Sequence, residues 1–371
     1  MSPAPLVLLI DGLHAKSGGG ITYLRAMVPR LAAQPGVSVH LCLHESQRPL
    51  FPEGSLGPVV HHWLDYPMSF WGQHWHEQIQ VPRLARRIRA GVTFAPANYG
   101  PLLVRRSVVL LRNALTVANV DKRPAKLLYW LLVYLATAAS LLACRRAIAV
   151  SGYARRAAAG PFMDHLVGGK ISIVPHGVDP LFAPPPPDQA RDSFLLAVSD
   201  LYIQKNLHTL LEAFARIAPA HPEIGLFIAG KPLDAQYFAR LQGRIAALGL
   251  ESRVEFLGHQ PAERLVDLYR RCRAFVFPST VESFGNPLAE ALACGAPVAC
   301  SNTAAMPEVA GEAALYFDPH DAAAMAEVLN RILGSESLRA ELSAKSLAQA
   351  VRYSWDRTAD ATLAVLRQAA V

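Results

Sequence analysis

Several features that would fix a function class are missing from this chain of 371 residues. Its five cysteines are scattered, odd in number and without CxxC spacing, which excludes a disulfide framework and a cysteine zinc site and indicates a reducing compartment. Histidine is more frequent, but His61, His62, His74 and His76 lack the other ligands of a metal motif. We therefore expect no resident metal.

Long apolar runs are also scarce. The run Leu6–Ile10 is too short for a signal peptide and ends at Asp11, so it predicts a buried first strand. The run Leu127–Ala143 has 17 residues without a charge, which is the lower limit for crossing a bilayer. It contains Thr137 and Ser140, and basic residues flank it on both sides. We expect a buried or interfacial helix, with a membrane span as the alternative.

Apolar residues make up 52% of the sequence, which favours a folded chain. The length of 371 residues favours two domains. Charge is unevenly distributed: residues 1–185 carry 19 Lys and Arg against 8 Asp and Glu, whereas residues 186–371 carry 17 against 21. The basic half is expected to meet a membrane surface or a phosphate-bearing substrate. The alternative is that basic residues such as those of 83–90 only form the solvated face of a helix.

Short apolar runs alternate with helical patterns, which is typical of parallel sheets with crossover helices. Four consecutive prolines, Pro184–Pro187, disfavour helix and sheet and predict an extended linker. We therefore predict two sheet-and-helix domains, residues 1–183 and 184–352, with a ligand-binding cleft between them. The expected strands are Pro5–Ile10, Val37–Leu43, Val92–Ala95, Val108–Leu111, Ala147–Val150, Phe194–Val198, Gly225–Ala229, Val254–Phe256, Ala274–Phe277 and Val298–Cys300.

Two strand-to-helix junctions carry candidate chemistry of modest specificity. The glycines Gly18–Gly20 permit close approach of the backbone to a ligand at a helix N-terminus, although their spacing is neither GxGxxG nor GxxxxGK. Lys205 follows the strand Phe194–Val198 and is placed to reach a phosphate. Taken alone, the glycines are also compatible with an ordinary tight turn, and Lys205 is also compatible with a solvated side chain near a helix start.

The junction VESFGNPLAEALACGAP, residues 281–297, is far more specific. Glu282 and Glu290 are separated by seven residues, with Gly285 and Pro287 between them where a helix begins. Backbone N–H groups and the helix dipole favour an anion at such a place. The carboxylates can accept hydrogen bonds from sugar hydroxyls and from a vicinal diol such as ribose. Ordinary helix capping does not require strand, loop, glycine, proline and both carboxylates in this order.

The stretch PSTVESFGNPLAEALACGAPVACSNTAAMPEVAGEAALYFDPHD resembles the donor-binding signature of the retaining, nucleotide-sugar-dependent glycosyltransferases of family 4, whose E-x7-E motif matches Glu282 and Glu290. The resemblance extends to the glycines Gly18–Gly20, to AVSGYARR before the linker, to PHGVD at 175–179 and to YSWDRTADATL near the C-terminus. It implies an α/β fold of the GT-B class, with two Rossmann-like domains facing each other across a cleft. A C-terminal helix within 353–371 would cross back to the N-terminal, acceptor-binding domain.

The resemblance also implies roles for individual residues. Lys205 would bind the donor diphosphate, which Gly19 and Gly20 would approach from the other domain. Glu290 would bind the ribose. Glu282 would hold the transferred sugar and the phosphates together with the backbone of Ser283, Phe284, Gly285 and Asn286. No metal or other cofactor is implied, since basic side chains and helix dipoles would stabilise the leaving diphosphate.

Two positions depart from the family pattern. The family's usual Arg, five residues before the diphosphate Lys, is replaced by Asp200, and Arg112 is the candidate substitute for the lost donor-binding charge. A family His near the transferred sugar is also absent, and Asn113 stands in that segment, where it can hydrogen-bond a sugar hydroxyl. The candidate catalytic residues are therefore Glu282, Lys205 and Asn113.

These features predict a cytoplasmic retaining hexosyltransferase, with mannose favoured, that uses a nucleoside diphosphate sugar. The expected acceptor is a saccharide or a lipid-linked saccharide in bacterial lipopolysaccharide O-chain or exopolysaccharide synthesis. Docking at the anionic inner face of the membrane would use the basic first domain, the aromatic segment 61–78 and Leu127–Ala143; alternatively, Trp71 and Trp75 pack in the core. No nucleic-acid partner is expected. The rival functions are a non-catalytic GT-B-like partner in a polysaccharide assembly complex and an enzyme with another activated donor.

Overall fold

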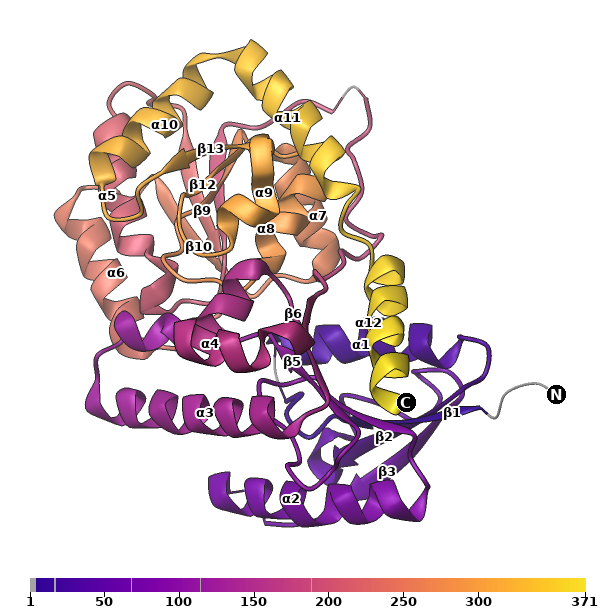
Figure 1. The fold of residues 1–371 in the computed structure, drawn as a ribbon. Helices are drawn as coiled ribbons and strands as arrows, with labels where there is room; N and C mark the ends of the chain where they lie inside the picture. Colours follow the sequence, from indigo (N-terminus) through magenta and orange to yellow (C-terminus); the bar gives the residue numbers. More distant parts are fainter. Residues whose placement is uncertain (1–4, 17, 68, 114, 188) are drawn as a thin grey trace. The chain divides into compact units, whose positions relative to one another are not determined.

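The computed structural model describes residues 5–16, 18–67, 69–113, 115–187 and 189–371. The chain forms two compact units (Figure 1). Unit 1 comprises Met1–Leu115, Arg123–Gly177 and Ser354–Val371, so it contains both ends of the chain. Unit 2 comprises Thr116–Lys122 and Val178–Tyr353.

Unit 1 is built on a seven-stranded sheet in the order β3-β2-β1-β4-β5-β6-β7, and all strand pairs are parallel. Its strands are β1 (Leu6–Asp11), β2 (Val37–His44), β3 (Val59–Leu64), β4 (Val92–Ala95), β5 (Ser107–Leu111), β6 (Arg146–Ala149) and β7 (Ile171–Ile173). The central strands are apolar runs buried on both faces, as parallel sheets require. The strand order reverses between β1 and β4, and ligands bind beyond the carboxyl ends of strands at such a reversal.

Helices cover both faces of this sheet (Figure 1). They are α1 (Gly18–Ala32), α2 (Phe70–Arg87), α3 (Pro124–Ala143), α4 (Gly152–Val167) and α12 (Trp355–Ala370), with short 3-10 turns η1 (Glu45–Gln47) and η3 (Gly168–Lys170). The 3-10 turn η2 (Leu115–Asn119) begins at the end of a unit 1 segment and continues into the segment Thr116–Lys122 of unit 2. The last helix, α12, packs on α1 and on β4, β5 and β6. The ring of Trp355 lies 5.8 Å from that of Tyr23 and 5.7 Å from that of His176, which seals α12 into the core of unit 1.

Unit 2 contains a six-stranded parallel sheet in the order β10-β9-β8-β11-β12-β13. Its strands are β8 (Phe194–Val198), β9 (Gly225–Ala229), β10 (Val254–Gly258), β11 (Ala274–Phe277), β12 (Val298–Ser301) and β13 (Ala314–Phe317). Its helices are α5 (Leu207–Ile217), α6 (Ala235–Ala247), α7 (Ala262–Arg271), α8 (Asn286–Ala293), α9 (Met306–Ala310), α10 (Ala322–Gly334) and α11 (Glu336–Ala350), with 3-10 turns η4 (Ile203–Lys205) and η5 (Gly311–Ala313). The order reverses between β8 and β11, where the predicted donor residues follow both strands.

The ten strands expected from apolar runs are all present, with ends that shift by one or two residues. The apolar pattern does not predict β3, β7 or β13. β3 includes His61 and His62 and lies at a sheet edge, where burial no longer requires a continuous apolar run. β7 has three residues and also lies at an edge.

The helix expected over Leu127–Ala143 is confirmed as α3, but its burial is not. Its buried side chains are Val133, Thr137, Ser140 and Leu141. Leu128, Leu135 and Leu142 are instead 59%, 54% and 58% exposed. Among the described helices, α3 is the one whose length and composition suffice for crossing a membrane.

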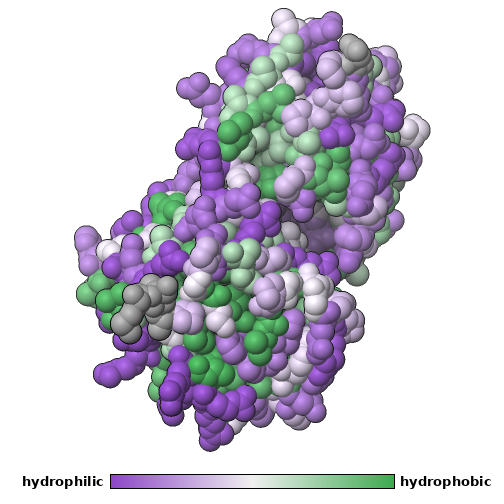
Figure 2. Space-filling model, turned by 90° about the vertical axis from the view of Figure 1, so that its right-hand side faces the viewer, coloured by the Kyte–Doolittle hydropathy of each residue, from purple (hydrophilic) through white to green (hydrophobic). Residues whose placement is uncertain are grey.

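The core packing considered for Trp71 and Trp75 of α2 is not found for Trp75. Trp75 is 68% exposed, and the side chain of Trp71 lies outside the described part of the structure. The face drawn in Figure 2 is largely hydrophilic, with apolar side chains gathered in separate patches. Folded proteins normally expose some apolar side chains, so only a group of them on one element indicates a binding surface.

Candidate active site

In unit 2, Lys205 and Glu282 meet at the reversal of the strand order. Lys205 ends η4, in the loop after β8, and Glu282 lies in the loop after β11. The Nζ atom of Lys205 donates to Oε1 of Glu282 over 2.5 Å, and the two side chains are 17% and 15% exposed. This ion pair therefore places one cation and one carboxylate at the sheet edge where a ligand is expected.

A network of buried hydrogen bonds fixes the two loops relative to each other. Asn206 has a left-handed backbone, with φ of 55°, and its side-chain amide donates to the carbonyl oxygens of Pro278 and Pro319 at 3.1 and 2.6 Å. The backbone N–H of Thr280 donates to the carbonyl oxygen of Gln204 at 2.9 Å. The positions of Lys205 and Glu282 are thus held by neighbours on both loops and not only by their mutual attraction.

The loop from β11 enters α8 through a glycine that no other residue replaces without strain. Gly285 has φ of 88°, and a Cβ atom on it would lie 3.1 Å from Cε1 of Phe277. The side chain of Phe284 is buried against the ring of Tyr353, with centroids 5.4 Å apart, so it anchors the loop. Any role of Phe284 or Gly285 in holding a ligand therefore depends on their backbone groups.

Glu290 lies within α8, the helix that this loop enters. The hydroxyl of Tyr269 donates to its Oε2 atom at 3.1 Å. Burial raises the pKa of Glu290 to about 7, an effect that the Tyr269 hydrogen bond partly offsets and the charge of Asp179 reinforces. Hydrogen bonds donated by a diol favour the ionised form of a carboxyl group whose pKa lies near neutrality. Binding of such a diol is the role predicted for Glu290.

Asp200, which stands where the family has Arg, is part of the backbone framework. Its Oδ1 atom accepts a hydrogen bond from the backbone N–H of Lys231 at 3.0 Å. Lys231 follows β9, at the same edge of the sheet, and its side chain is exposed. Lys231 is a further cation near the donor residues that the sequence pattern does not identify, because no motif surrounds it.

In unit 1, the glycine loop and Arg112 meet at the corresponding edge. A Cβ atom on Gly20 would lie 2.9 Å from Nη2 of Arg112, so the absence of a side chain leaves room for the guanidinium. Burial lowers the pKa of Arg112. Gly18 has φ of 49°, and Gly18 and Gly19 are exposed whereas Gly20 is buried. A ligand can thus approach the backbone closely at Gly19, whereas the space beside Gly20 is occupied by the Arg112 guanidinium.

Asn98 positions Arg112, the predicted substitute for the missing donor-binding charge, and Asn113, which is predicted near the transferred sugar. Its Oδ1 atom accepts hydrogen bonds from the backbone N–H groups of Arg112 at 3.0 Å and Asn113 at 2.8 Å. Asn98 is fully buried, and the side chain of Asn113 is exposed. The sequence analysis missed Asn98, although a polar residue just after the apolar run Val92–Ala95 is a usable signal for a residue that fixes a neighbouring turn.

A buried acidic cluster adjoins the glycine loop and was also missed. Asp11 ends β1, and Glu77 lies on α2 with its Oε2 atom 3.0 Å from Nε2 of His14. The side-chain amide of Gln73 lies 2.9 Å from Nδ1 of the same His14. Burial raises the pKa of Glu77 to about 8 and lowers that of His14 to about 4. Burial also raises the pKa of Asp11, and the charge of Glu77 raises it further.

Within the described residues, no group of three or more His, Cys, Asp or Glu side chains could hold a metal ion. The donor residues themselves are one lysine, two glutamates and backbone amides. This set suits an anionic, hydroxyl-rich ligand whose charge is met by lysine and by a helix N-terminus.

Comparison with known proteins agrees with this geometry. Residues 184–348 match the family model described as Glycosyl transferases group 1. A segment of 113 residues is 42% identical to the O-antigen chain mannosyltransferase B of Escherichia coli, and it covers 30% of this chain and 30% of that protein. The curated relatives that the chain matches are covered over about a quarter to a half of their own lengths.

Solved structures resemble the whole chain. Sucrose-phosphate synthase from Thermosynechococcus elongatus superposes with a TM-score of 0.77 at 19% identity, over 98% of both chains. Anabaena HepE in complex with UDP-glucose gives a TM-score of 0.76 at 18% identity, over 98% of this chain and 99% of that one. The predicted fold class is thereby confirmed: the chain has the GT-B fold.

Proposed function

We propose, on the premise that residues 184–348 match the glycosyl transferases group 1, that the chain is a retaining hexosyltransferase that uses a nucleoside diphosphate sugar. The observation that carries this proposal is the meeting of Lys205 and Glu282 at the strand-order reversal of unit 2, with Glu290 on the adjoining helix. A donor diphosphate would compete with Glu282 for the Lys205 ammonium group. Glu282 would then be released to accept hydrogen bonds from the hydroxyls of the transferred sugar.

The proposed reaction needs no enzymatic nucleophile. The acceptor hydroxyl attacks the anomeric carbon on the face that the diphosphate leaves, and a donor phosphate oxygen takes the hydroxyl proton. Lys205 and the N-terminus of α8 would stabilise the charge that develops on the leaving diphosphate, while Asn113 from unit 1 would hydrogen-bond the sugar. Retention follows from attack on that face, and an inverted product anomer, detected by NMR, would contradict it.

We favour mannose as the transferred sugar and a saccharide of the lipopolysaccharide O-chain, or a lipid-linked saccharide, as the acceptor. This choice rests on the similarity to the O-antigen chain mannosyltransferase B. The nucleoside base is left open, since one structural neighbour binds UDP-glucose and bases differ among members of one fold. No divalent metal is proposed.

We further propose a peripheral location at an anionic, cytoplasmic membrane face. The exposed leucines of α3 supply apolar surface for the acyl boundary. Arg123 and Lys126 at its first end, with Arg145 and Arg146 after its last residue, supply cations for the lipid phosphates. A lipid-linked acceptor would be met at such a surface.

The donor proposal is tested by calorimetric titration and thermal unfolding with UDP, GDP, ADP and their sugars, with and without EDTA. We expect one nucleotide to stabilise the protein by about 2.7 kcal/mol at 100 times its Kd. EDTA should leave this effect unchanged. Lys205→Ala should abolish it, whereas Lys345→Ala, which removes an exposed lysine paired with Glu341 on α11, should not.

Each outcome separates the two candidate functions. Selective stabilisation that depends on Lys205 would support the transferase and identify the base. The replacement of the family Arg by Asp200 favours the rival, a non-catalytic partner in a polysaccharide assembly complex. Absence of any nucleotide response would overturn the transferase proposal and leave that rival.

A further inference from the structure

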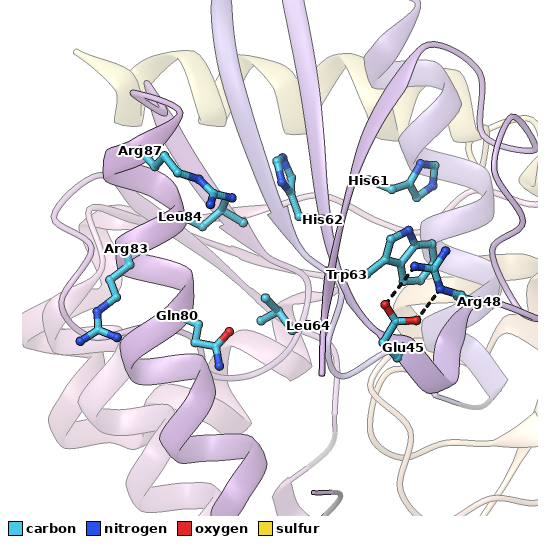
Figure 3. Close-up of a pocket in the computed structure, with 10 residues that line it drawn as sticks. All are labelled: Glu45, Arg48, His61, His62, Trp63, Leu64, Gln80, Arg83, Leu84 and Arg87. Atoms are coloured by element: carbon cyan, nitrogen blue, oxygen red, sulfur yellow. Dashed lines mark hydrogen bonds and ion pairs between the residues drawn. The ribbon is translucent and has the colours of Figure 1, made fainter. Parts of the chain in front are cut away.

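A second pocket lies in unit 1, along the edge of the sheet formed by β3 (Figure 3). Its volume is about 620 Å³, and it is lined by β3, by the C-terminal half of α2 and by η1 with the residue after it. None of the residues that line it was assigned to the donor site or to the acidic cluster. Figure 3 shows Arg83 and Arg87 on α2 facing the side of β3 from which His62 projects.

The charge of this pocket is positive and incompletely compensated. Arg83 and Arg87 are four residues apart, so they share one face of α2. Both are exposed, and neither forms an ion pair or hydrogen bond with any described residue. Glu45 is the only acid among the described lining residues, and it already accepts from Nη2 of Arg48 at 2.9 Å. Two guanidinium groups therefore remain available to an anion.

The face of β3 that points away from Arg83 and Arg87 carries polar atoms that lack partners (Figure 3). Nε2 of His61 and Nε1 of Trp63 are buried without a hydrogen-bond partner among the described residues. The Trp63 ring is held between the Arg48 guanidinium, 4.4 Å from its centroid, and the His61 ring, whose centroid is 5.5 Å away. Trp63 and His61 therefore shape the edge strand, and the groups available to an anion on the α2 side are the two arginines.

His62 adds a further group suited to an anion. Its Nε2 atom lies 2.9 Å from Nδ1 of His40, and the two rings stack with centroids 5.2 Å apart. Burial lowers the pKa of His62, and the neighbouring positive charges of His40, Arg87 and His61 lower it further. The permanent positive charge in this group is that of Arg87, which faces the same side of β3 as His62, and an anion placed beside it would be attracted.

We propose that this pocket is a second binding site, specific for a phosphate group, which Arg83 and Arg87 hold through their guanidinium N–H groups. The planar guanidinium group binds phosphate oxygens through two parallel N–H groups, whereas a lysine ammonium acts as a point charge. A pair of arginines therefore indicates a phosphate as the ligand. A soluble phosphate ester and a lipid head group present the same oxygens, so both belong to the proposed ligand class. The inference is independent of the proposed transferase reaction and goes beyond it.

A neighbouring surface strengthens the attraction for such a ligand. Arg86, Arg89, Arg105 and Arg106 line another pocket, of about 410 Å³, on the same helix and the loop before β5. No described lining residue of that pocket is acidic. The combined field would draw anions toward α2 and raise their local concentration at low salt.

The test measures phosphate binding by calorimetry in a Lys205→Ala background, so that the donor site does not contribute. The probes are inorganic phosphate and pyrophosphate for the soluble source. Vesicles of phosphatidic acid, with phosphatidylcholine vesicles as reference, represent the lipid source. The variant is the double substitution Arg83→Gln/Arg87→Gln. The matched control is Arg240→Gln/Arg244→Gln, another pair four residues apart on an exposed helix, in which Arg244 already pairs with Glu212.

We expect Arg83→Gln/Arg87→Gln to weaken binding of one probe class at least about tenfold, and the control to leave it unchanged. Loss with inorganic phosphate or pyrophosphate would support the site with a soluble ligand. Loss confined to phosphatidic acid vesicles would support it with a lipid head group. Equal binding by the double variant and the control for every probe would overturn the proposal. Nucleotide binding by the double variant with Lys205 intact tests the donor site separately.

Discussion

Unit 1 contains two buried carboxyl groups, Asp11 and Glu77, and the fold raises the pKa of each. Each is at most 1% exposed. Transfer of a carboxylate from water into such a place is unfavourable, so the neutral form is favoured. His14 and Gln73 complete the cluster, and the glycine loop that follows His14 depends on its arrangement.

The raised pKa of Glu77 predicts a contribution to the stability of unit 1 that decreases as the pH rises. The pKa is about 8 in the folded protein against 4.5 for an ordinary Glu side chain, so the folded state retains a proton that the unfolded state has released. This contribution should fall by up to about 1.4 kcal/mol per pH unit between pH 4.5 and about 8 and should then level off. Glu77→Gln should remove this slope. The lowered pKa of His14 acts with the opposite sign between about pH 4 and 6.5, so the effect of Glu77 is the difference between the wild-type and Glu77→Gln profiles.

Urea unfolding between pH 5 and 9, followed by tryptophan fluorescence, measures this effect. All five tryptophans belong to unit 1, so the signal reports that unit alone. Glu53→Gln, in which the replaced side chain is 71% exposed, controls for the loss of a carboxylate. Parallel pH profiles for wild type and Glu77→Gln would contradict the assignment.

Among the elements, α3 is unusual because its apolar face is turned outward. Val133, Thr137, Ser140 and Leu141 attach it to unit 1, and Thr137 donates to the carbonyl oxygen of Val133 at 2.7 Å. Leu128 and Leu135 lie on the exposed surface, seven residues and thus about two turns apart. A helix with this distribution is suited to lie in a membrane interface and not to fill a core.

Leu128→Glu/Leu135→Glu should weaken binding to anionic vesicles at least about tenfold. The reason is the loss of two leucine side chains, each worth about 1.5–3 kcal/mol on full burial. Sedimentation with phosphatidylglycerol vesicles at low and high salt is the measurement. Val351→Glu, which replaces an exposed valine of unit 2, should bind as wild type does. Undiminished binding by the double variant would exclude α3 as the docking element.

At the scale of the whole molecule, unit 1 is discontinuous in sequence. Its C-terminal helix follows unit 2 in the chain and packs on α1 and three strands of the first sheet. Leu363 and Leu366 of α12 are buried in that core. The chain therefore passes between the two units at four places, and the helical layer on the first sheet is not complete until the last residues have been added.

Leu366→Ala should lower the free energy of unfolding of unit 1 by about 2–5 kcal/mol, because it leaves a cavity between α12 and the sheet. Tryptophan-detected urea unfolding measures the change. Gln368→Ala, an exposed position on the same helix, should change it by less than about 0.5 kcal/mol. A small effect of Leu366→Ala would mean that α12 contributes little to the stability of unit 1.

The alternation of apolar runs and helical patterns was sufficient to predict both sheets, since interior strands of a parallel sheet are apolar on both faces. Edge strands escape this rule, which explains why β3 with His61 and His62 was not predicted. The E-x7-E spacing likewise led to the loop and helix that carry Glu282 and Glu290. Their functional roles, and those of Lys205, Arg112 and Asn113, stay predictions until ligand binding is measured.

The sequence by itself determined the fold class and led to the family match over residues 184–348, because both depend on local periodicity and on residues close together in the chain. Only the tertiary structure decided which distant residues meet: Lys205 with Glu282, Asn98 with the turn at Arg112, and Arg83 and Arg87 with the histidines of β3. It also decided that α3 is exposed. Burial and pairing across long sequence separations depend on how elements pack, and a local pattern does not contain that information.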